Sequence, residues 1–191
     1  MKFCSHCGER VRTLVPEDDT RPRHVCPSCR TIHYQNPKIV TGIIPEWEDR
    51  ILLCRRAIEP RYGLWTLPAG FMERGETIQQ GAARETLEEA HARVEVRALY
   101  SLFNLPHIDQ VYMLFRGRLL DLDFGPGSES LEVTLFEEQD IPWDEIAFPV
   151  VKETLALYFE DRTRGEFRLH SGEIVRLQEQ IMGYRVTRYS D

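Results

Sequence analysis

Residues 70–92 read GFMERGETIQQGAARETLEEAHA, and most of the expected architecture follows from this segment. It begins with a Gly-rich loop and continues into a run rich in Ala, Leu and Glu, which are strong helix formers. Thr77 and Gln80, three residues apart, have the spacing of a capping box. We therefore expect a helix from about Thr77 to Ala90, entered from the loop.

Three glutamates share one face of this expected helix. Glu85, Glu88 and Glu89 stand at i, i+3 and i+4, which are neighbouring positions on a helix surface. Like charges so placed destabilise a bare helix, whereas magnesium or manganese would bind their oxygens. The alternative is a solvated acidic face with no ligand. Arg84 is placed to reach back to Glu76 and pin the loop onto the helix.

The spacing of these residues resembles a known family motif. Gly70-x5-Glu76-x7-Arg84-Glu85-x-x-Glu88-Glu89 is similar to the Nudix box, Gly-x5-Glu-x7-Arg-Glu-U-x-Glu-Glu-x-Gly-U, where U is bulky and aliphatic. Thr86, His91 and Ala92 depart from it at positions that hold no ligand, so they affect the packing and the end of the helix. The preceding loop, LWTLPAG at 64–70, also resembles that of the family.

The resemblance implies a fold, a reaction and a set of roles. The fold would be α+β, the α/β/α sandwich of the Nudix family with a mixed sheet. The reaction would be metal-assisted hydrolysis of the pyrophosphate bond of a nucleoside diphosphate derivative, releasing AMP and a second phosphorylated product. The implied roles are magnesium binding by Glu85, Glu88, Glu89 and the Gly70 carbonyl, structural support from Glu76 and Arg84, and catalysis by Glu88, Glu85 and Glu132. Glu129 is the alternative to Glu132, and either is otherwise a surface acid.

The substrate is less constrained than the reaction. A cysteine-rich segment before such a box resembles bacterial NADH pyrophosphatases, but their downstream Ser-Gln-Pro-Trp-Pro-Phe-Pro-x-Ser motif is absent from residues 101–110. Segments 68–73, 84–90 and 141–148 are more similar to the plant chloroplast ADP-ribose/FAD pyrophosphatase branch, which favours ADP-ribose or FAD. The candidates for substrate contact are Arg55, Arg61 and Phe71, with Arg56 also near the loop. The reading from another class is a module that binds nucleotides, RNA or a protein without catalysis.

Four cysteines near the N-terminus form two Cys-x-x-Cys pairs. Cys4 and Cys7 are followed by Cys26 and Cys29 at the spacing of a tetrahedral zinc site. Residues 1–35 are too few to build a sizeable core, so bound zinc would supply the folding energy. A redox dithiol or a disulfide pair is the alternative. The fifth cysteine, Cys54, lies in an apolar run and is expected to be buried.

The remaining segments indicate strands around two helices. Strands are expected at 39–44 and 51–54, joined by a turn at 45–50, and at 93–103, 110–120 and 132–136, with a second helix at 148–160. The tail has a short alternating run at 167–170, and its last stretch carries no recognisable pattern. We therefore expect a zinc ribbon at 1–35, a Nudix hydrolase domain at 36–162 and a C-terminal extension at 163–191.

The composition bounds the kinds of partner. The net charge is −7, so nucleic acid is an unlikely partner and a small phosphorylated molecule bridged by cations is favoured. No run of residues approaches the ~18 apolar residues of a membrane span, and the start lacks a signal peptide. We expect a cytoplasmic protein without a membrane segment. Because many members of the family are dimers, we also expect a homodimer.

Overall fold

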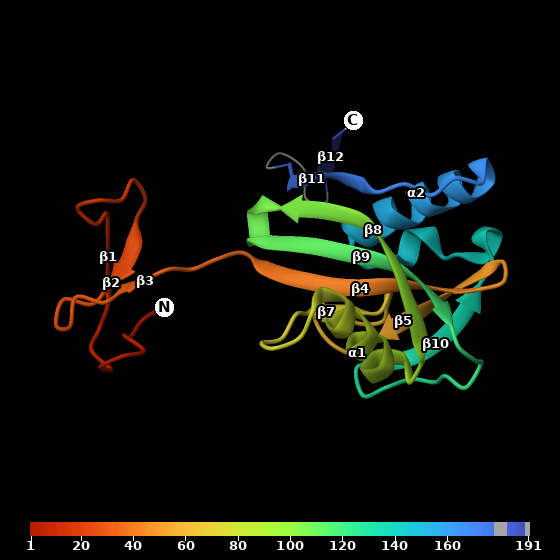
Figure 1. Ribbon diagram of the computed structural model, residues 1–191, viewed down its shortest axis with the longest axis horizontal. Coiled ribbons are helices and arrows are strands. Elements are labelled where there is room, and N and C mark those ends of the chain that lie inside the picture. The colour runs from red at the N-terminus through yellow and green to blue at the C-terminus, as the bar shows by residue number, and fades with distance from the viewer. Residues whose placement is uncertain (178–182, 190–191) are drawn as a thin grey trace. The chain divides into compact units, whose positions relative to one another are not determined.

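The computed structural model describes residues 1–177 and 183–189. The chain forms two compact units, Met1–Pro37 and Lys38–Asp191, which Figure 1 shows joined by one stretch of chain. No helix among the described residues is long and apolar enough to cross a membrane.

The first unit is a small antiparallel sheet without an apolar core. Its strands are β1 (Arg12–Leu14), β2 (Arg23–Val25) and β3 (Ile32–His33), in the order β1-β2-β3. The buried residues that the structure describes in this unit are Cys4, Cys26 and His33. Such a unit buries too little apolar surface to offset the entropy of ordering its chain.

The second unit is built on one mixed sheet with the strand order β10-β5-β4-β9-β8-β11-β12. The pairs β4–β9 and β8–β11 are parallel, and the other pairs in this order are antiparallel. Two short strands pair beside this order, β6 with β5 and β7 with β4. The bounds are β4 (Lys38–Trp47), β5 (Arg50–Arg56), β6 (Trp65–Thr66), β7 (Ala69–Phe71), β8 (Val94–Leu105), β9 (Gln110–Leu119), β10 (Ser130–Phe136), β11 (His170–Arg176) and β12 (Tyr184–Tyr189).

Two α-helices, α1 (Ile78–Ala90) and α2 (Pro149–Arg164), cover opposite faces of this sheet. Adjacent residues of a strand point to opposite faces. On β4, Ile43 packs in a cluster with Ala82 of α1, whereas Ile44 packs in the larger cluster that contains Leu155 of α2. The fold is therefore the expected α/β/α sandwich with a mixed sheet. Three short 3-10 helices, η1 (Pro106–Ile108), η2 (Glu138–Asp140) and η3 (Trp143–Glu145), lie in the connections.

The helix expected from the 70–92 segment is confirmed, with its cap. The Thr77 side chain accepts a hydrogen bond from the Gln80 backbone N–H, and the Gln80 side chain accepts one from the Thr77 backbone N–H. Thr86 is fully buried, and its hydroxyl donates to the Ala82 carbonyl at 2.8 Å. This bond satisfies a polar group at a position where the family motif has an aliphatic residue.

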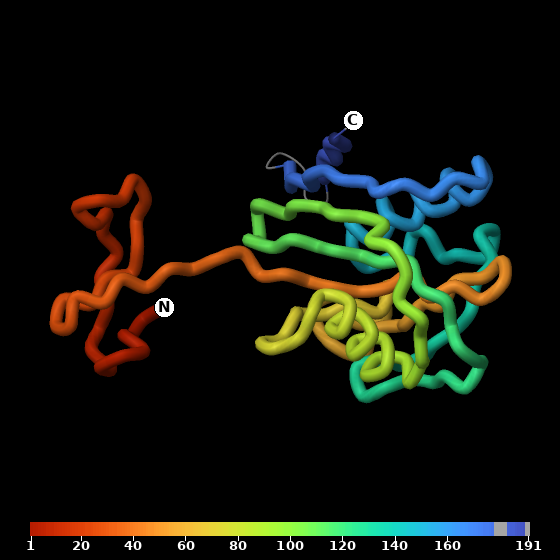
Figure 2. Tube along the Cα trace, in the orientation of Figure 1, coloured from red at the N-terminus to blue at the C-terminus, as the bar shows by residue number. Residues whose placement is uncertain are grey.

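Other boundaries differ from the expected ones for identifiable reasons. The hairpin expected from 39–44 and 51–54 is confirmed, since β4 and β5 pair antiparallel. Its turn is shorter than the expected 45–50, because Pro45 is in register with Gly117 of β9 and the strand continues to Trp47. The second helix runs four residues beyond Glu160, to the left-handed Gly165. The alternating run at 167–170 is not a strand: β11 begins only at His170, and Phe167 packs against the core under the Arg116 guanidinium. The final stretch, which has no pattern of its own, forms β12 against β11. Figure 2 shows the described part of this path.

The end of α1 provides a test of backbone strain. His91 ends the helix in the left-handed region, with φ 49° and its backbone N–H on the Leu87 carbonyl. His91 is exposed, so few contacts hold its side chain in place. An L-residue in this conformation is strained by ~1–2 kcal/mol, and glycine removes that strain. Part of the gain is cancelled, because glycine also raises the conformational entropy of the unfolded chain. We expect His91→Gly to raise the free energy of unfolding by about 0.5–1 kcal/mol.

Urea unfolding followed by tryptophan fluorescence measures this effect, because Trp47, Trp65 and Trp143 all lie in the second unit. His91→Ala is the matched control: it also removes the imidazole but keeps the Cβ. If His91→Ala were stabilised as much as His91→Gly, backbone strain would not be the cause.

Candidate functional site

One cleft in the second unit collects the charged residues of the 70–92 segment. Its volume is about 760 Å³, within the ~300–1,000 Å³ range of small-molecule sites. Apolar and aromatic side chains share its lining with a group of charged ones. The charged lining consists of Arg56, Glu59, Glu73, Arg84, Glu85, Glu88, Glu89 and Glu129.

The three glutamates of α1 meet in this cleft, as their spacing predicts. Glu89 is buried at 7% exposure, and its Oε2 accepts a hydrogen bond from the Ala69 backbone N–H at 3.2 Å. Glu85 is half-buried, and the side chain of Glu88 is 58% exposed. Exposure to solvent therefore increases across the cluster, from the buried Glu89 to the open end at Glu88.

Gly70 leaves room for the Glu85 carboxylate at this point. It lies on β7, in register with Thr41 of β4. A Cβ built at Gly70 would overlap the Glu85 carboxylate. Any other residue would displace the carboxylate, so the glycine lets Glu85 keep this position. Gly70 and Glu85 thus lie in direct contact, with the Gly70 backbone beside the carboxylate cluster.

Arg84 ties the loop to the helix, as expected from its position. Its guanidinium contacts both oxygens of Glu76, with Nε to Oε2 at 3.0 Å and Nη2 to Oε1 at 2.9 Å. The same group donates to Glu85 at 2.8 Å, to Glu88 at 2.9 Å and to the Phe71 carbonyl at 3.1 Å. Hydrogen bonding from Arg84 lowers the pKa of Glu76 to about 2. Glu76 is therefore charged and held, and the 70–76 loop is fixed over the start of α1.

The electrostatics of the cluster favour a cation. Burial raises the pKa of Glu89 to about 8, and the charges of Glu85 and Glu129 add to this shift. Burial also raises the pKa of Glu85, although Arg84 opposes it. Carboxylates that lose their hydration and repel one another recover stability when a divalent cation binds between them. An all-oxygen donor set fits magnesium or manganese better than a soft metal.

Of the two glutamates considered beyond the box, the structure brings Glu129 to the cleft. Glu129 lines it and acts on the pKa of both Glu85 and Glu89. Glu132 is not among the described residues that line the cleft. Its side chain is 51% exposed and lies 3.8 Å from Arg55. A β-bulge between Ser130 and Glu132 changes the register against β5 at this point, which sequence spacing cannot reveal.

The candidate substrate contacts divide in the same way. Phe71 lines the cleft, 47% exposed, with the Lys38 ammonium 4.7 Å from its ring centroid. Arg55 and Arg61 are not among the described residues that line the cleft, and Arg55 donates to the Gly63 carbonyl at 2.9 Å. Arg56 lines it instead, because neighbouring residues of β5 face opposite sides of the sheet. Several cleft residues carry no sequence signal of their own, among them His107, Ile174 and Tyr184.

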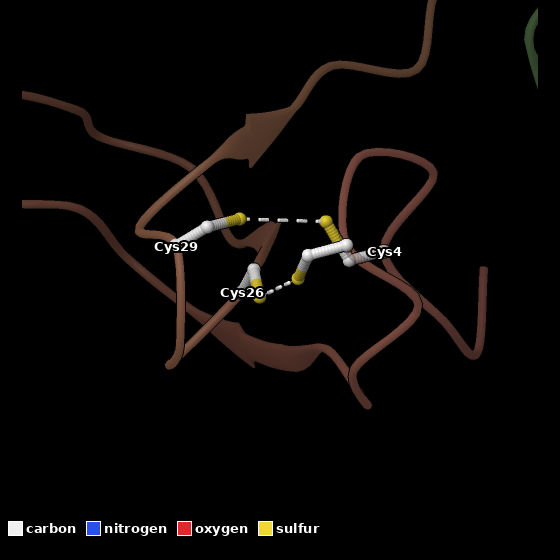
Figure 3. Close-up of side chains that lie close together, drawn as sticks. Cys4, Cys26 and Cys29 are labelled. Atoms are coloured by element: carbon white, nitrogen blue, oxygen red, sulfur yellow. Dashed lines mark hydrogen bonds between the residues drawn. The ribbon is translucent and has the colours of Figure 1, made fainter.

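The four N-terminal cysteines form a second candidate metal centre. Their sulfurs lie within 4.8 Å of one another, and Figure 3 shows Cys4, Cys26 and Cys29 pointing inward. The Sγ–Sγ distances are 3.6 Å for Cys4–Cys29 and 3.5 Å for Cys7–Cys26. Tetrahedral zinc with Zn–S bonds of about 2.3 Å would place sulfurs about 3.8 Å apart. The separations fit four thiolate ligands of one zinc ion and exceed a disulfide bond.

Comparison with known proteins identifies the family of each part of the chain. Residues 2–35 match the family described as Nudix N-terminal, a zinc ribbon, and residues 36–154 match the NUDIX domain. A crystal structure of a NUDIX hydrolase from Nitrosomonas europaea is 63% identical, covers 92% of this chain and 100% of that one, and superposes with a TM-score of 0.90. An ADP-ribose pyrophosphatase from Streptococcus suis is 26% identical over 71% of this chain and 99% of its own, with a TM-score of 0.59.

Among characterised sequences, the NAD-capped RNA hydrolase NudC of Salmonella typhi is 38% identical over 96 residues. The match covers 49% of this chain and 35% of NudC. This chain thus spans about a third of the length of the relatives it matches there.

The buried Glu89 predicts how stability depends on pH in metal-free protein. Its folded pKa of about 8 lies above the ordinary value of 4.5, so folding favours the protonated form. The stability that this carboxyl contributes is full below about pH 4.5 and is lost as the pH rises to about 8. We expect Glu89→Gln to exceed the wild type in free energy of unfolding at pH 8, by a margin that shrinks toward pH 5.

Urea unfolding at the two pH values measures the margin, with the open-end variant Glu88→Gln as control. A margin that stayed the same at pH 5 and pH 8 would contradict the assignment to Glu89.

The cysteine cluster predicts one bound zinc per chain. We expect Cys26→Ser to abolish zinc binding, because three thiolates no longer close the site. Elemental analysis of the purified protein gives the zinc content. Cys54→Ala is the control: Cys54 is buried in β5 of the other unit, so its loss leaves the zinc in place. Full zinc content in Cys26→Ser would exclude the four-cysteine site.

Proposed function

This chain belongs to the Nudix family, and from that premise we propose that it hydrolyses the pyrophosphate linkage of nucleoside diphosphate derivatives with a divalent cation. The observation that supports the proposal is the cluster of Glu85, Glu88 and Glu89 in a cleft of ligand size, packed against Gly70. A solvated acidic face, the alternative reading of the same residues, would not bury Glu89 at 7% exposure.

The residues that would hold the cation follow from this geometry. Glu85, Glu88 and Glu89 would provide carboxylate oxygens, and the Gly70 carbonyl lies beside them as a further candidate. Magnesium or manganese bound there would neutralise phosphate oxygens and lower the pKa of water. Glu76 and Arg84 would act as supports, since the two are engaged with each other through both carboxylate oxygens.

The chain's own groups would then position the water and receive its proton. Water adds to one phosphorus of the P–O–P linkage, its proton passes to a glutamate, and the bridging oxygen leaves with the other phosphate. Glu129 is our candidate base because it lines the cleft from outside α1; Glu88 and Glu85 are the alternatives. Arg56, also in the lining, would contact the diphosphate.

We favour ADP-ribose or FAD as the substrate, with AMP as one product. Support comes from the segments similar to the ADP-ribose/FAD pyrophosphatase branch and from the 26% identity to an ADP-ribose pyrophosphatase. NADH is the second candidate, because the NudC relatives act on NAD-capped RNA by name. The alternative from a different functional class is a protein that binds nucleotides without cleaving them. We expect a cytoplasmic homodimer with structural zinc. We expect neither nucleic acid nor a membrane as a partner.

The proposal is tested by measuring AMP release from ADP-ribose, FAD, NADH and diadenosine polyphosphates, with and without magnesium. Magnesium-dependent release from any of them supports a pyrophosphohydrolase, and the relative kcat/KM values rank the substrates. If no member of the panel is cleaved while nucleotides still bind, the non-catalytic reading replaces the proposal.

The carboxylates give a sharper prediction. We expect Glu88→Gln to lower kcat by orders of magnitude with the fold intact, because it removes a charged ligand. We expect Glu129→Gln to lower kcat by ~10²-fold or more, as loss of a general base does. Glu132→Gln is the matched control, in the same strand region but outside the cleft lining, and should stay within a few-fold of the wild type. Retained activity in Glu88→Gln, or a larger loss in Glu132→Gln than in Glu129→Gln, would contradict these roles.

A further inference from the structure

The strands β11 and β12 lie beyond the matched domain, which ends at residue 154. They nevertheless contribute two residues, Ile174 and Tyr184, to the lining of the cleft. Ile174 is fully buried and Tyr184 half-buried. The region with the weakest sequence pattern is therefore part of the candidate active site.

Strand register places these two residues away from the carboxylates. Gly70 and Phe71 of β7 pair with β4, β4 pairs with β9, and β9 pairs with β8. Strands lie about 4.8 Å apart, so β7 and β8 are separated by about 14 Å. Beyond β8 lies β11, in parallel register with it. A diphosphate held at the carboxylates could not reach this end, but the nucleoside attached to it could.

The far end of the cleft is apolar and aromatic. Leu105 ends β8, His107 and Ile108 lie in η1 between β8 and β9, Tyr112 lies on β9, and Ile174 and Tyr184 lie on the C-terminal strands. Tyr112 is buried at 9% exposure. The His107 and Tyr184 rings lie 5.9 Å apart between centroids, tilted by 54°. The rings are near neighbours but not stacked, and His107 is exposed and Tyr184 half-buried, so both side chains keep accessible surface. Such a surface suits a flat aromatic heterocycle.

The C-terminal strands are anchored, so Tyr184 is held in place. The Asn104 side chain donates to the Gly172 carbonyl of β11 at 3.2 Å. Arg188 of β12 forms an ion pair with Glu153 of α2 at 2.6 Å. Because alternate residues of a strand share a face, Tyr184 points to the same side as Arg188. Tyr189 points to the opposite side, away from α2.

We propose that the β11–β12 strand pair and the β8–β9 turn form a subsite for an aromatic ring of the substrate, with His107 and Tyr184 as its contact residues. The inference rests on the proposed function for the orientation of the ligand, whose diphosphate would lie at the carboxylates. The occupant is a purine, flavin or nicotinamide ring joined through ribose or ribitol to that diphosphate. The strand pair thereby selects substrates that carry a ring on this arm.

Calorimetric binding without added magnesium tests the subsite directly. The probes are AMP and FMN, with ribose 5-phosphate as the probe that lacks a ring. Loss of a base-stacking aromatic costs ~1–3 kcal/mol, or roughly 5- to 150-fold in affinity. We expect Tyr184→Ala to weaken AMP or FMN binding by this factor and to leave ribose 5-phosphate unchanged. Tyr184→Phe should restore the affinity, and Tyr189→Ala, the same change on the opposite face of β12, should not alter it.

Kinetics on the cleaved substrate of the panel add a second readout. Tyr184→Ala and His107→Ala should raise KM with kcat nearly unchanged, because they alter binding far from the reacting phosphorus. Equal losses for ribose 5-phosphate and the ring-bearing probes, or no loss for AMP and FMN, would overturn the subsite. If the wild type cleaves nothing yet AMP or FMN affinity still depends on Tyr184, the proposed hydrolysis fails and the subsite stands.

Discussion

The burial of Glu85 and Glu89 against the backbone of β7 is the constraint on which the rest of the second unit depends. A carboxylate removed from water is costly unless it is paired or hydrogen-bonded. Here the Ala69 N–H and the Arg84 guanidinium offset only part of that cost, since the pKa of both acids stays raised. Gly70 leaves room for the Glu85 carboxylate, and Arg84 fixes the loop that carries Gly70. The arrangement is poor for the stability of the metal-free chain and well suited to receive a cation.

The sheet converts this local cluster into a site with two ends. Seven strands lie side by side, and the two helices occupy opposite faces. The cleft spans from β7 across β4, β9 and β8 to β11 and β12. A charged part at α1 and an aromatic part at the C-terminal strands therefore share one cavity. On the proposed function, chemistry and recognition would be supplied by different segments, so the second could change without disturbing the first.

The first unit solves a different physical problem. Thirty-odd residues with two buried cysteines and a buried histidine have no hydrophobic core. A metal ion held by the four thiolates would replace that core, because its binding free energy becomes folding free energy. His33 lies 3.2 Å from the Cys4 sulfur, where it adds a hydrogen bond to a ligand atom. The second unit, with its apolar clusters on both sides of the sheet, has no such requirement.

Local chemistry determined much of this protein from the sequence alone. Some features act over a few residues or at fixed spacing and can therefore be recognised in the sequence. They are the capping box, the i, i+3, i+4 glutamates, the Arg84–Glu76 pair and the paired cysteines. Only the tertiary structure decided which of Glu129 and Glu132 faces the cleft, because a bulge against β5 sets the register there. It alone placed Arg56 rather than Arg55 in the lining, continued β4 through Pro45, and brought Tyr184 to His107. Those outcomes depend on pairing between strands distant in the chain, and no spacing within the sequence encodes them.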